Sequence, residues 1–144
     1  MPTTQNYKNH IRWYPLVHFI LSPLLTINLI WQSVRLYQES SWDRGESVLL
    51  AAALIILSVA ARLQALAAQD RVIRLEERLR YSMILSAGLA ARAAELPTKQ
   101  MIALRFAGDD ELPKLVERTL GGEFKTNKEI KLAIRNWRGD YLRV

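Results

Sequence analysis

The stretch SVLLAAALIILSVAARLQALAA, residues 47–68, decides the fold of this 144-residue chain. It carries a single charge, Arg62, six positions before its end. A bilayer span needs about 20 mainly apolar residues, and the long stem of Arg62 can carry its guanidinium to the headgroups. We therefore predict a transmembrane helix. The alternative is a buried core helix of a soluble protein, but two such apolar blocks would leave too little polar chain to cover them.

The other apolar block, residues 15–36, has no formal charge between Leu16 and Val34. A helix from Tyr14 to Tyr37 is about 35 Å long, which exceeds a hydrocarbon core of about 30 Å. Aromatic residues flank both ends, as at membrane interfaces: Trp13 and Tyr14 at one, Trp31, Tyr37 and Trp42 at the other. Pro23 is expected to bend this helix around residues 19–23. A signal peptide is the competing interpretation, but no small-residue cleavage site closes the block.

Basic residues near the membrane predict the orientation of the spans. Lys8 and Arg12 precede the first span with no acid among residues 1–15. Five arginines lie at the end of the second span or follow it: Arg62, Arg71, Arg74, Arg78 and Arg80. Because basic residues favour the cytoplasmic side, we expect a multi-pass protein of the bacterial inner membrane with both termini in the cytoplasm. The loop of residues 38–46 then faces outward.

The second span is expected to continue as a helix into the cytoplasm, because neither proline nor glycine interrupts residues 47–87. Val72, Leu75, Leu79 and Met83 have helical spacing, and Asp70–Arg74 and Glu76–Arg80 are favourable pairs four residues apart. The arginines Arg62, Arg71, Arg74 and Arg78 are candidates for contact with an anionic lipid surface. A solvated helix face is the equally weighted alternative.

Three shorter helices are predicted next, over residues 87–95, 99–107 and 112–120. Ser86 and Thr98 are the expected caps of the first two, and Asp109 or Asp110 of the third, which carries Pro113 in its first turn. The acidic run of residues 109–111 could be taken for a metal site. Acid at the positive end of a helix explains it without a metal, so we favour capping.

The last predicted helix begins at the capping box Thr126-Asn127-Lys128-Glu129 and ends near Gly139. Its apolar face would carry Ile130, Ile134 and Trp137, which are the residues we expect to dock against a partner. Its adjoining face would be basic, with Lys128, Lys131, Arg135 and Arg138. The fold class is therefore all-α: a two-helix transmembrane hairpin in residues 1–69, and a small cytoplasmic helical bundle in residues 70–144.

Composition excludes several kinds of site. The absence of cysteine excludes disulfides, thiolate metal centres and a cysteine nucleophile. The two histidines, His10 and His18, form no metal cluster in the sequence. No Gly-rich phosphate loop or activated nucleophile stands in a recognisable motif, so we expect no enzyme. The net charge of +6 suits an anionic lipid surface or a nucleic acid, and by itself selects neither.

Several long strings match a known family: QNYKNH at residues 5–10, QDRVIRLEERLR at 69–80, IALRFAGDDELP at 102–113 and IKLAIRNWRGDYLRV at 130–144. Through them the chain resembles, over nearly its whole length, an uncharacterised family of small bacterial membrane proteins catalogued as a domain of unknown function. The resemblance implies two spans and a cytoplasmic helical tail. It implies no catalytic or binding residues.

Three functions compete at this stage. The preferred hypothesis is a non-enzymatic accessory, scaffolding or assembly subunit of a larger membrane complex, of the kind that respiratory and photosynthetic complexes carry. The alternative is a haem- or chlorophyll-binding subunit that uses His18 as an axial ligand; an interfacial histidine bonded to backbone is the commoner use. A tether to lipid or nucleic acid through the basic helices is the third, and nucleic acid is not favoured because acids interrupt the basic residues.

Overall fold

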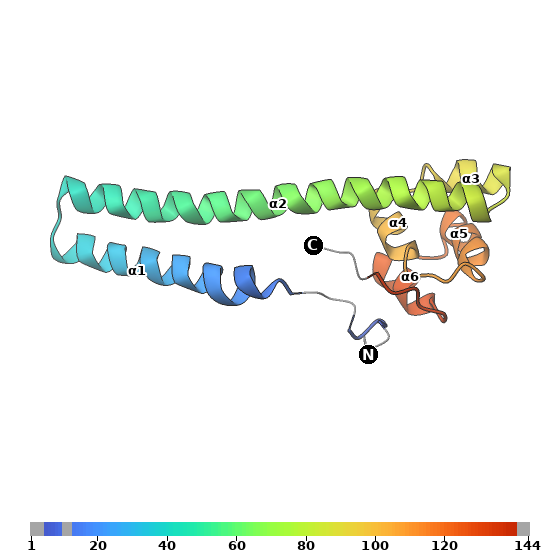
Figure 1. Cartoon of the computed structure of the whole chain (residues 1–144), viewed down its shortest axis with the longest axis horizontal. Coiled ribbons are helices and arrows are strands. Elements are labelled where there is room, and N and C mark those ends of the chain that lie inside the picture. The colour runs from blue at the N-terminus through green and yellow to red at the C-terminus, as the bar shows by residue number, and fades with distance from the viewer. Residues whose placement is uncertain (1–4, 10–12, 141–144) are drawn as a thin grey trace. The chain divides into compact units, whose positions relative to one another are not determined.

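The computed structural model describes residues 5–9 and 13–140 (Figure 1). Within these residues it is helical, with no strand apart from one isolated bridge between Ala107 and Trp137. The elements are η1 (Leu16–Leu21), α1 (Ser22–Gln38), α2 (Trp42–Ile84), α3 (Ala87–Ala93), α4 (Thr98–Leu104), α5 (Leu112–Leu120) and α6 (Asn127–Ala133). This confirms the all-α class. His10, Arg12 and Tyr141 lie outside the described residues.

Contacts divide the chain into two compact units, and the boundary falls inside α2. The paired-helix unit is Arg12–Leu66, and the helical domain is Ala67–Val144 together with Met1–Ile11. The backbone N–H of Asp140 donates to Oε1 of Gln5 at 2.7 Å. Residues 5–9 thus belong with the helical domain, an association that the sequence did not indicate.

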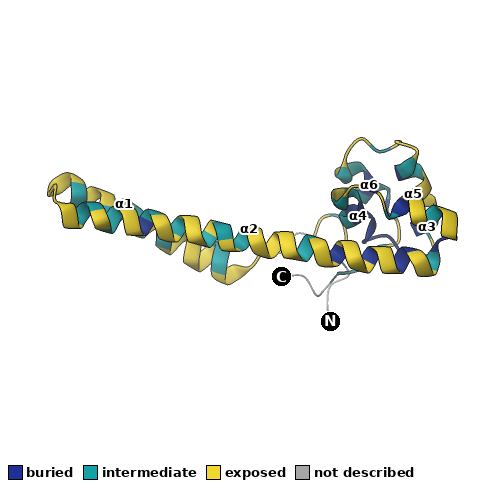
Figure 2. Cartoon of the chain, turned by 90° about the horizontal axis from the view of Figure 1, so that it is seen from above, coloured by how far each residue is buried: buried dark blue, intermediate teal, exposed yellow. Residues whose placement is uncertain are grey.

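In the paired-helix unit, α1 and the first part of α2 lie side by side and run in opposite directions, joined by residues 39–41 (Figure 1). Ala51 is buried, while most of the large apolar side chains are exposed (Figure 2). The helical stretch Leu16–Gln38, formed by η1 and α1, and the helix α2 are each long and apolar enough to cross a membrane. As expected, α2 continues without a break beyond residue 68, as far as Ile84.

At the position where a bend was expected, the turn before Pro23 is a π-helical segment, η1. Proline has no N–H to donate, so the turn before it is free to widen. In η1, the carbonyl oxygen of Val17 accepts from the backbone N–H of Ser22 and, at 2.8 Å, from the Ser22 hydroxyl. A residue five positions away thus satisfies this carbonyl, as in a π-helix.

The core of the helical domain gathers apolar side chains from the end of α2 and from each shorter helix. The largest fully buried side chains are Tyr81, Met101, Leu104, Phe106, Leu112, Val116 and Ile130. On α5 the buried residues Leu112, Leu115, Val116 and Thr119 recur every three or four positions, the spacing of one helix face. This pattern follows the expectation for residues 112–120.

Two predicted caps are wrong. Residue Thr98 is the first residue of α4, which follows Pro97 and ends at Leu104 rather than Ala107. Residue Glu111, not Asp109 or Asp110, occupies the N-cap of α5, and no side chain caps that helix. Ser86 does take the N-cap position of α3, although its side chain makes no capping bond. The acids before α5 instead make contacts far along the chain.

The capping box at Thr126 is confirmed, since its side chain accepts from the backbone N–H of Glu129. The expected end of that helix is wrong, because α6 stops at Ala133 and Ile134 is extended. The following N–H groups donate elsewhere: Arg135 and Asn136 to the Glu111 carboxylate, and Arg138 to the Phe106 carbonyl. Competing acceptors thus end the helix, so the apolar and basic faces predicted over residues 127–139 do not exist as helix faces.

Candidate functional site: a buried charge cluster

His18 lies in η1, where its Nδ1 is 3.0 Å from the carbonyl oxygen of Tyr14. A carbonyl oxygen only accepts, so Nδ1 carries the proton and donates. The ring also meets the edge of Trp13, with centroids 5.0 Å apart.

The four arginines expected at a lipid surface differ in their surroundings. Arg71 and Arg74 are exposed, and Arg62 is partly buried in the paired-helix unit. Arg78 donates from Nε and Nη2 to the carbonyl oxygen of Ala94, at 3.1 and 2.8 Å. That bond ties α2 to the end of α3, so Arg78 has a structural role that the sequence did not indicate.

The residues expected to dock against a partner make contacts within their own domain. Ile130 is 0% and Ile134 6% exposed, and both belong to the core of the helical domain. Trp137 packs on the core, with its ring centroid 5.1 Å from that of Phe106. Ile130 and Ile134 are therefore buried within their own domain, whereas Trp137 is only partly buried.

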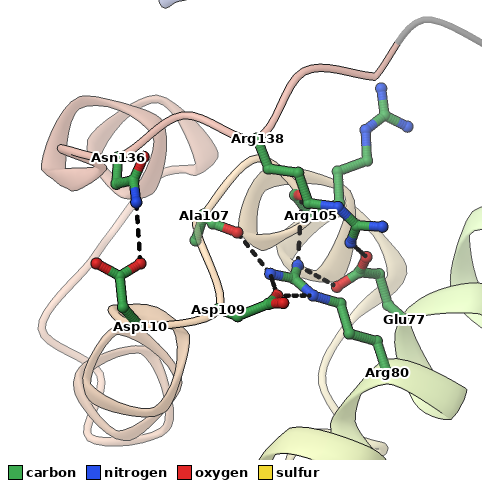
Figure 3. Close-up of polar contacts among 8 residues, drawn as sticks. All are labelled: Glu77, Arg80, Arg105, Ala107, Asp109, Asp110, Asn136 and Arg138. Atoms are coloured by element: carbon green, nitrogen blue, oxygen red, sulfur yellow. Dashed lines mark hydrogen bonds and ion pairs between the residues drawn. The ribbon is translucent and has the colours of Figure 1, made fainter.

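The helical domain contains a group of charged residues that the sequence did not single out, of which Glu77, Arg80 and Arg105 are buried. We call it the charge cluster, and Figure 3 shows its members: Glu77, Arg80, Arg105, Asp109 and Arg138. Glu77 and Arg80 come from α2, whereas the others come from the residues after α4 and from the C-terminal segment. The cluster thus joins three separate stretches of the domain.

Arg80 is the centre of the charge cluster, with a side chain only 6% exposed. Its Nε and Nη2 donate to Oδ1 of Asp109 at 2.9 and 2.5 Å, and Nη2 also donates to the Ala107 carbonyl at 2.6 Å. Its Nη1 lies 3.4 Å from both the Glu77 carboxylate and the carbonyl oxygen of Arg105. The guanidinium therefore satisfies backbone carbonyls that the loop between α4 and α5 would otherwise leave buried without a donor.

Glu77 is the buried acid of the cluster, with a side chain 5% exposed. Burial raises the pKa of Glu77 above its ordinary value, and the neighbouring guanidinium groups of Arg80 and Arg138 only partly oppose this. Arg138 Nη1 is 3.9 Å from its Oε1. Burial and the charge of Glu77 also raise the pKa of Tyr81.

The acidic run of residues 109–111 contributes to the same region. Asp110 Oδ1 accepts from Nδ2 of Asn136 at 3.1 Å, and the Glu111 carboxylate accepts from two backbone N–H groups of the C-terminal segment. A Cβ at Gly108 would lie 2.6 Å from Asp110 Oδ1, so glycine allows this close approach. Asp110 and Glu111 thus bind groups after α6, whereas Asp109 binds Arg80 of α2. Among the described residues no three acids or histidines gather as a metal site.

One signal in the sequence pointed to the charge cluster. Ile73, Glu77 and Tyr81 are four residues apart, so they share a face of α2. That face packs into the domain, and Arg80 pairs with Glu77 rather than with Glu76 as expected. The apolar residues Val72, Leu75, Leu79 and Met83 are instead 54–71% exposed.

The raised pKa of Glu77 predicts a pH dependence of stability. A carboxyl whose pKa is higher in the folded state stabilises the fold when protonated, so its contribution is full at low pH and is lost as pH rises through that raised pKa. We expect Glu77→Gln to remove this part of the pH dependence of stability above pH 4.5, the ordinary pKa of a glutamate. Amide hydrogen exchange of the domain core measures the stability at each pH. Exposed Glu76→Gln is the control. Identical pH slopes for Glu77→Gln and the wild type would contradict the assignment.

Together, these features define an all-helical protein with two helices able to cross a membrane and a helical domain that contains the buried ion pair between Glu77 and Arg80. The chain belongs to the family of unknown function DUF6526, whose model matches residues 1–144. This confirms the resemblance to a domain of unknown function. No curated protein and no solved structure matches the chain.

Proposed function

We propose that this is a small non-enzymatic protein of the bacterial inner membrane, with residues 15–36 and 47–68 as a transmembrane hairpin and both termini in the cytoplasm. The observation that carries the proposal is the exposed apolar surface of the paired-helix unit. Its exposed residues include Phe19, Leu24, Ile27, Ile30, Leu49, Leu50, Ile56, Leu57 and Leu63. A soluble monomer rarely exposes so large an apolar patch, whereas lipid covers it without penalty.

Cysteine labelling tests the hairpin, because the chain has no cysteine of its own. We design Ser41→Cys in the connecting loop and Lys128→Cys at the start of α6, both at exposed positions. In intact spheroplasts, a membrane-impermeant maleimide should label Ser41→Cys alone, and Lys128→Cys should react only after permeabilisation. The reverse pattern, or a chain that stays in water without detergent, would overturn the proposal.

We further propose that the protein serves as an accessory, scaffolding or assembly subunit of a larger membrane complex. Two spans are few for a pore or transporter, and the helical domain carries exposed apolar side chains beyond its own core. Purification in mild detergent with quantitative mass spectrometry should find other membrane subunits in fixed proportion. Recovery of this chain alone would contradict the role.

Anionic lipid is the second partner that we propose, at Arg71 and Arg74. Each basic residue near such a surface contributes about 1 kcal/mol, and both arginines are exposed. Mass spectrometry of co-purified lipid should show enrichment of anionic species that falls in Arg71→Gln/Arg74→Gln. A lipid composition unchanged by the double substitution would remove this partner.

The alternative function is haem or chlorophyll binding through His18. The bond from Nδ1 to the Tyr14 carbonyl favours it, because ligating histidines commonly donate their other ring N–H to such an oxygen. A visible absorption spectrum that disappears in His18→Ala would support the alternative. A colourless wild-type preparation would exclude it.

A further inference from the structure

The stripe formed by Val72, Leu75, Leu79 and Met83 is the largest apolar feature of the helical domain without a cover in the structure. These side chains are 54%, 71%, 62% and 71% exposed. They lie on roughly the opposite side of α2 from Ile73, Glu77 and Tyr81, which face the domain core, as follows from about 3.6 residues per turn. A second helix can therefore approach the stripe without meeting the domain's own helices.

The spacing of the stripe is that of a coiled-coil seam. Val72, Leu75 and Leu79 are separated by three and four residues, so they occupy positions a, d and a of a heptad. Ala68 is at the preceding d and the polar Ser82 at the following d. A β-branched residue at a with leucine at d favours two parallel strands. Met83 lies beside the seam and is flexible enough to fill an irregular contact.

Charges beside the seam are complementary to those of a second copy. In this register Arg71 is at g and Glu76 at e, five residues later. In a parallel pair the g residue lies next to the e residue of the following heptad on the partner. Each dimer would thus form the Arg71–Glu76 contact twice by symmetry. Both residues are exposed, and within residues 5–9 and 13–140 neither belongs to an ion pair of its own chain. In the dimer Arg71 is then engaged by the second copy, and Arg74 is the exposed arginine left for anionic lipid.

We infer that the protein forms a parallel homodimer in which residues 68–83 of α2 pair with the same residues of a second copy. The inference rests on the proposed membrane topology for one point, namely that two copies inserted the same way present parallel helices. Self-complementary charge and the apolar seam select a second copy over a different protein as the occupant.

Cross-linking in native membranes tests the dimer. Single cysteines at Val72, Leu75 and Leu79 should give a disulfide-linked dimer on mild oxidation, because a and d side chains of parallel helices meet their own copies. Arg74→Cys, on the same helix but outside the seam, should give little. Equal cross-linking at Arg74, or none at the three seam positions, would overturn the inference.

A charge exchange distinguishes the second copy from other occupants. With Leu75→Cys as the reporter, Arg71→Glu should abolish most of the cross-linked dimer, and the double exchange Arg71→Glu/Glu76→Arg should restore it. If the exchange fails to restore it, the seam does not pair with itself in the register proposed. The topology labelling at Ser41 and Lys128 is read separately, so failure of the dimer leaves the hairpin standing.

Discussion

Replacing Arg80 with methionine is expected to destabilise the helical domain by about 3–5 kcal/mol, the usual effect of removing one partner from a buried pair. The substitution keeps a similar apolar stem but leaves Glu77 buried beside fewer positive groups. It also deprives the carbonyl oxygens of Ala107 and Arg105 of their donor. The ion pair with Asp109 adds little to this figure, because that side chain is 67% exposed and solvent screens it.

Hydrogen exchange of the full-length protein in detergent measures the effect, because it reports each segment of the chain separately. Amides of α4 and α5 should lose protection in Arg80→Met, whereas Arg74→Met on the exposed side of α2 should leave them unchanged. The double variant Glu77→Gln/Arg80→Met should recover part of the loss, since it removes the uncompensated charge. Full protection in Arg80→Met would show that the charge cluster does not hold the domain together.

The second large effect is expected for Ile130→Ala in α6, at about 2–5 kcal/mol. The Ile130 side chain is fully buried, so truncation removes apolar contacts and leaves a cavity. The matched control is Leu132→Ala in the same helix, where the side chain is 57% exposed and the change should stay within about 0.5 kcal/mol. The two variants are compared by the hydrogen exchange of their core amides, measured at increasing temperature.

This pair of variants also decides between two roles for α6. If Ile130 stabilises its own domain, the wild type loses stability on truncation in the absence of any partner. If the side chain instead docked to another subunit, Ile130→Ala would leave the isolated protein as stable as the wild type. Equal effects of Ile130→Ala and Leu132→Ala would contradict the burial of Ile130 in the core.

Features that depend on neighbouring residues were predictable. The apolar run of residues 47–68 and the absence of proline and glycine after it predict one long helix, and α2 is continuous from Trp42 to Ile84. The capping box at Thr126 and Glu129 involves groups three residues apart, so it forms as the sequence indicates. Both follow from local hydrogen bonding and hydropathy, which the order of residues already contains.

Helix ends and caps near the charge cluster were less predictable. The pattern of residues 127–139 is typical of an amphipathic helix, yet α6 ends at Ala133 because Glu111 captures the next N–H groups. Likewise Asp109 and Asp110 suit a helix N-terminus but bind Arg80 and Asn136, which are 29 and 26 residues away. A local pattern does not reveal a hydrogen-bond partner so distant along the chain.

The choice of the buried face of α2 shows the same limit. Helical spacing puts Val72, Leu75 and Leu79 on one side and Ile73, Glu77 and Tyr81 on another, and hydropathy alone favours burying the first set. The fold buries the second, because Arg80 compensates the charge of Glu77 and at the same time donates to the backbone carbonyls of the α4–α5 loop. The order of residues established the helices and the apolar blocks, since these depend on near neighbours. Burying a charge depends on partners that only folding brings within 4 Å. The tertiary structure therefore decided which charges form the cluster and which face of α2 stays exposed.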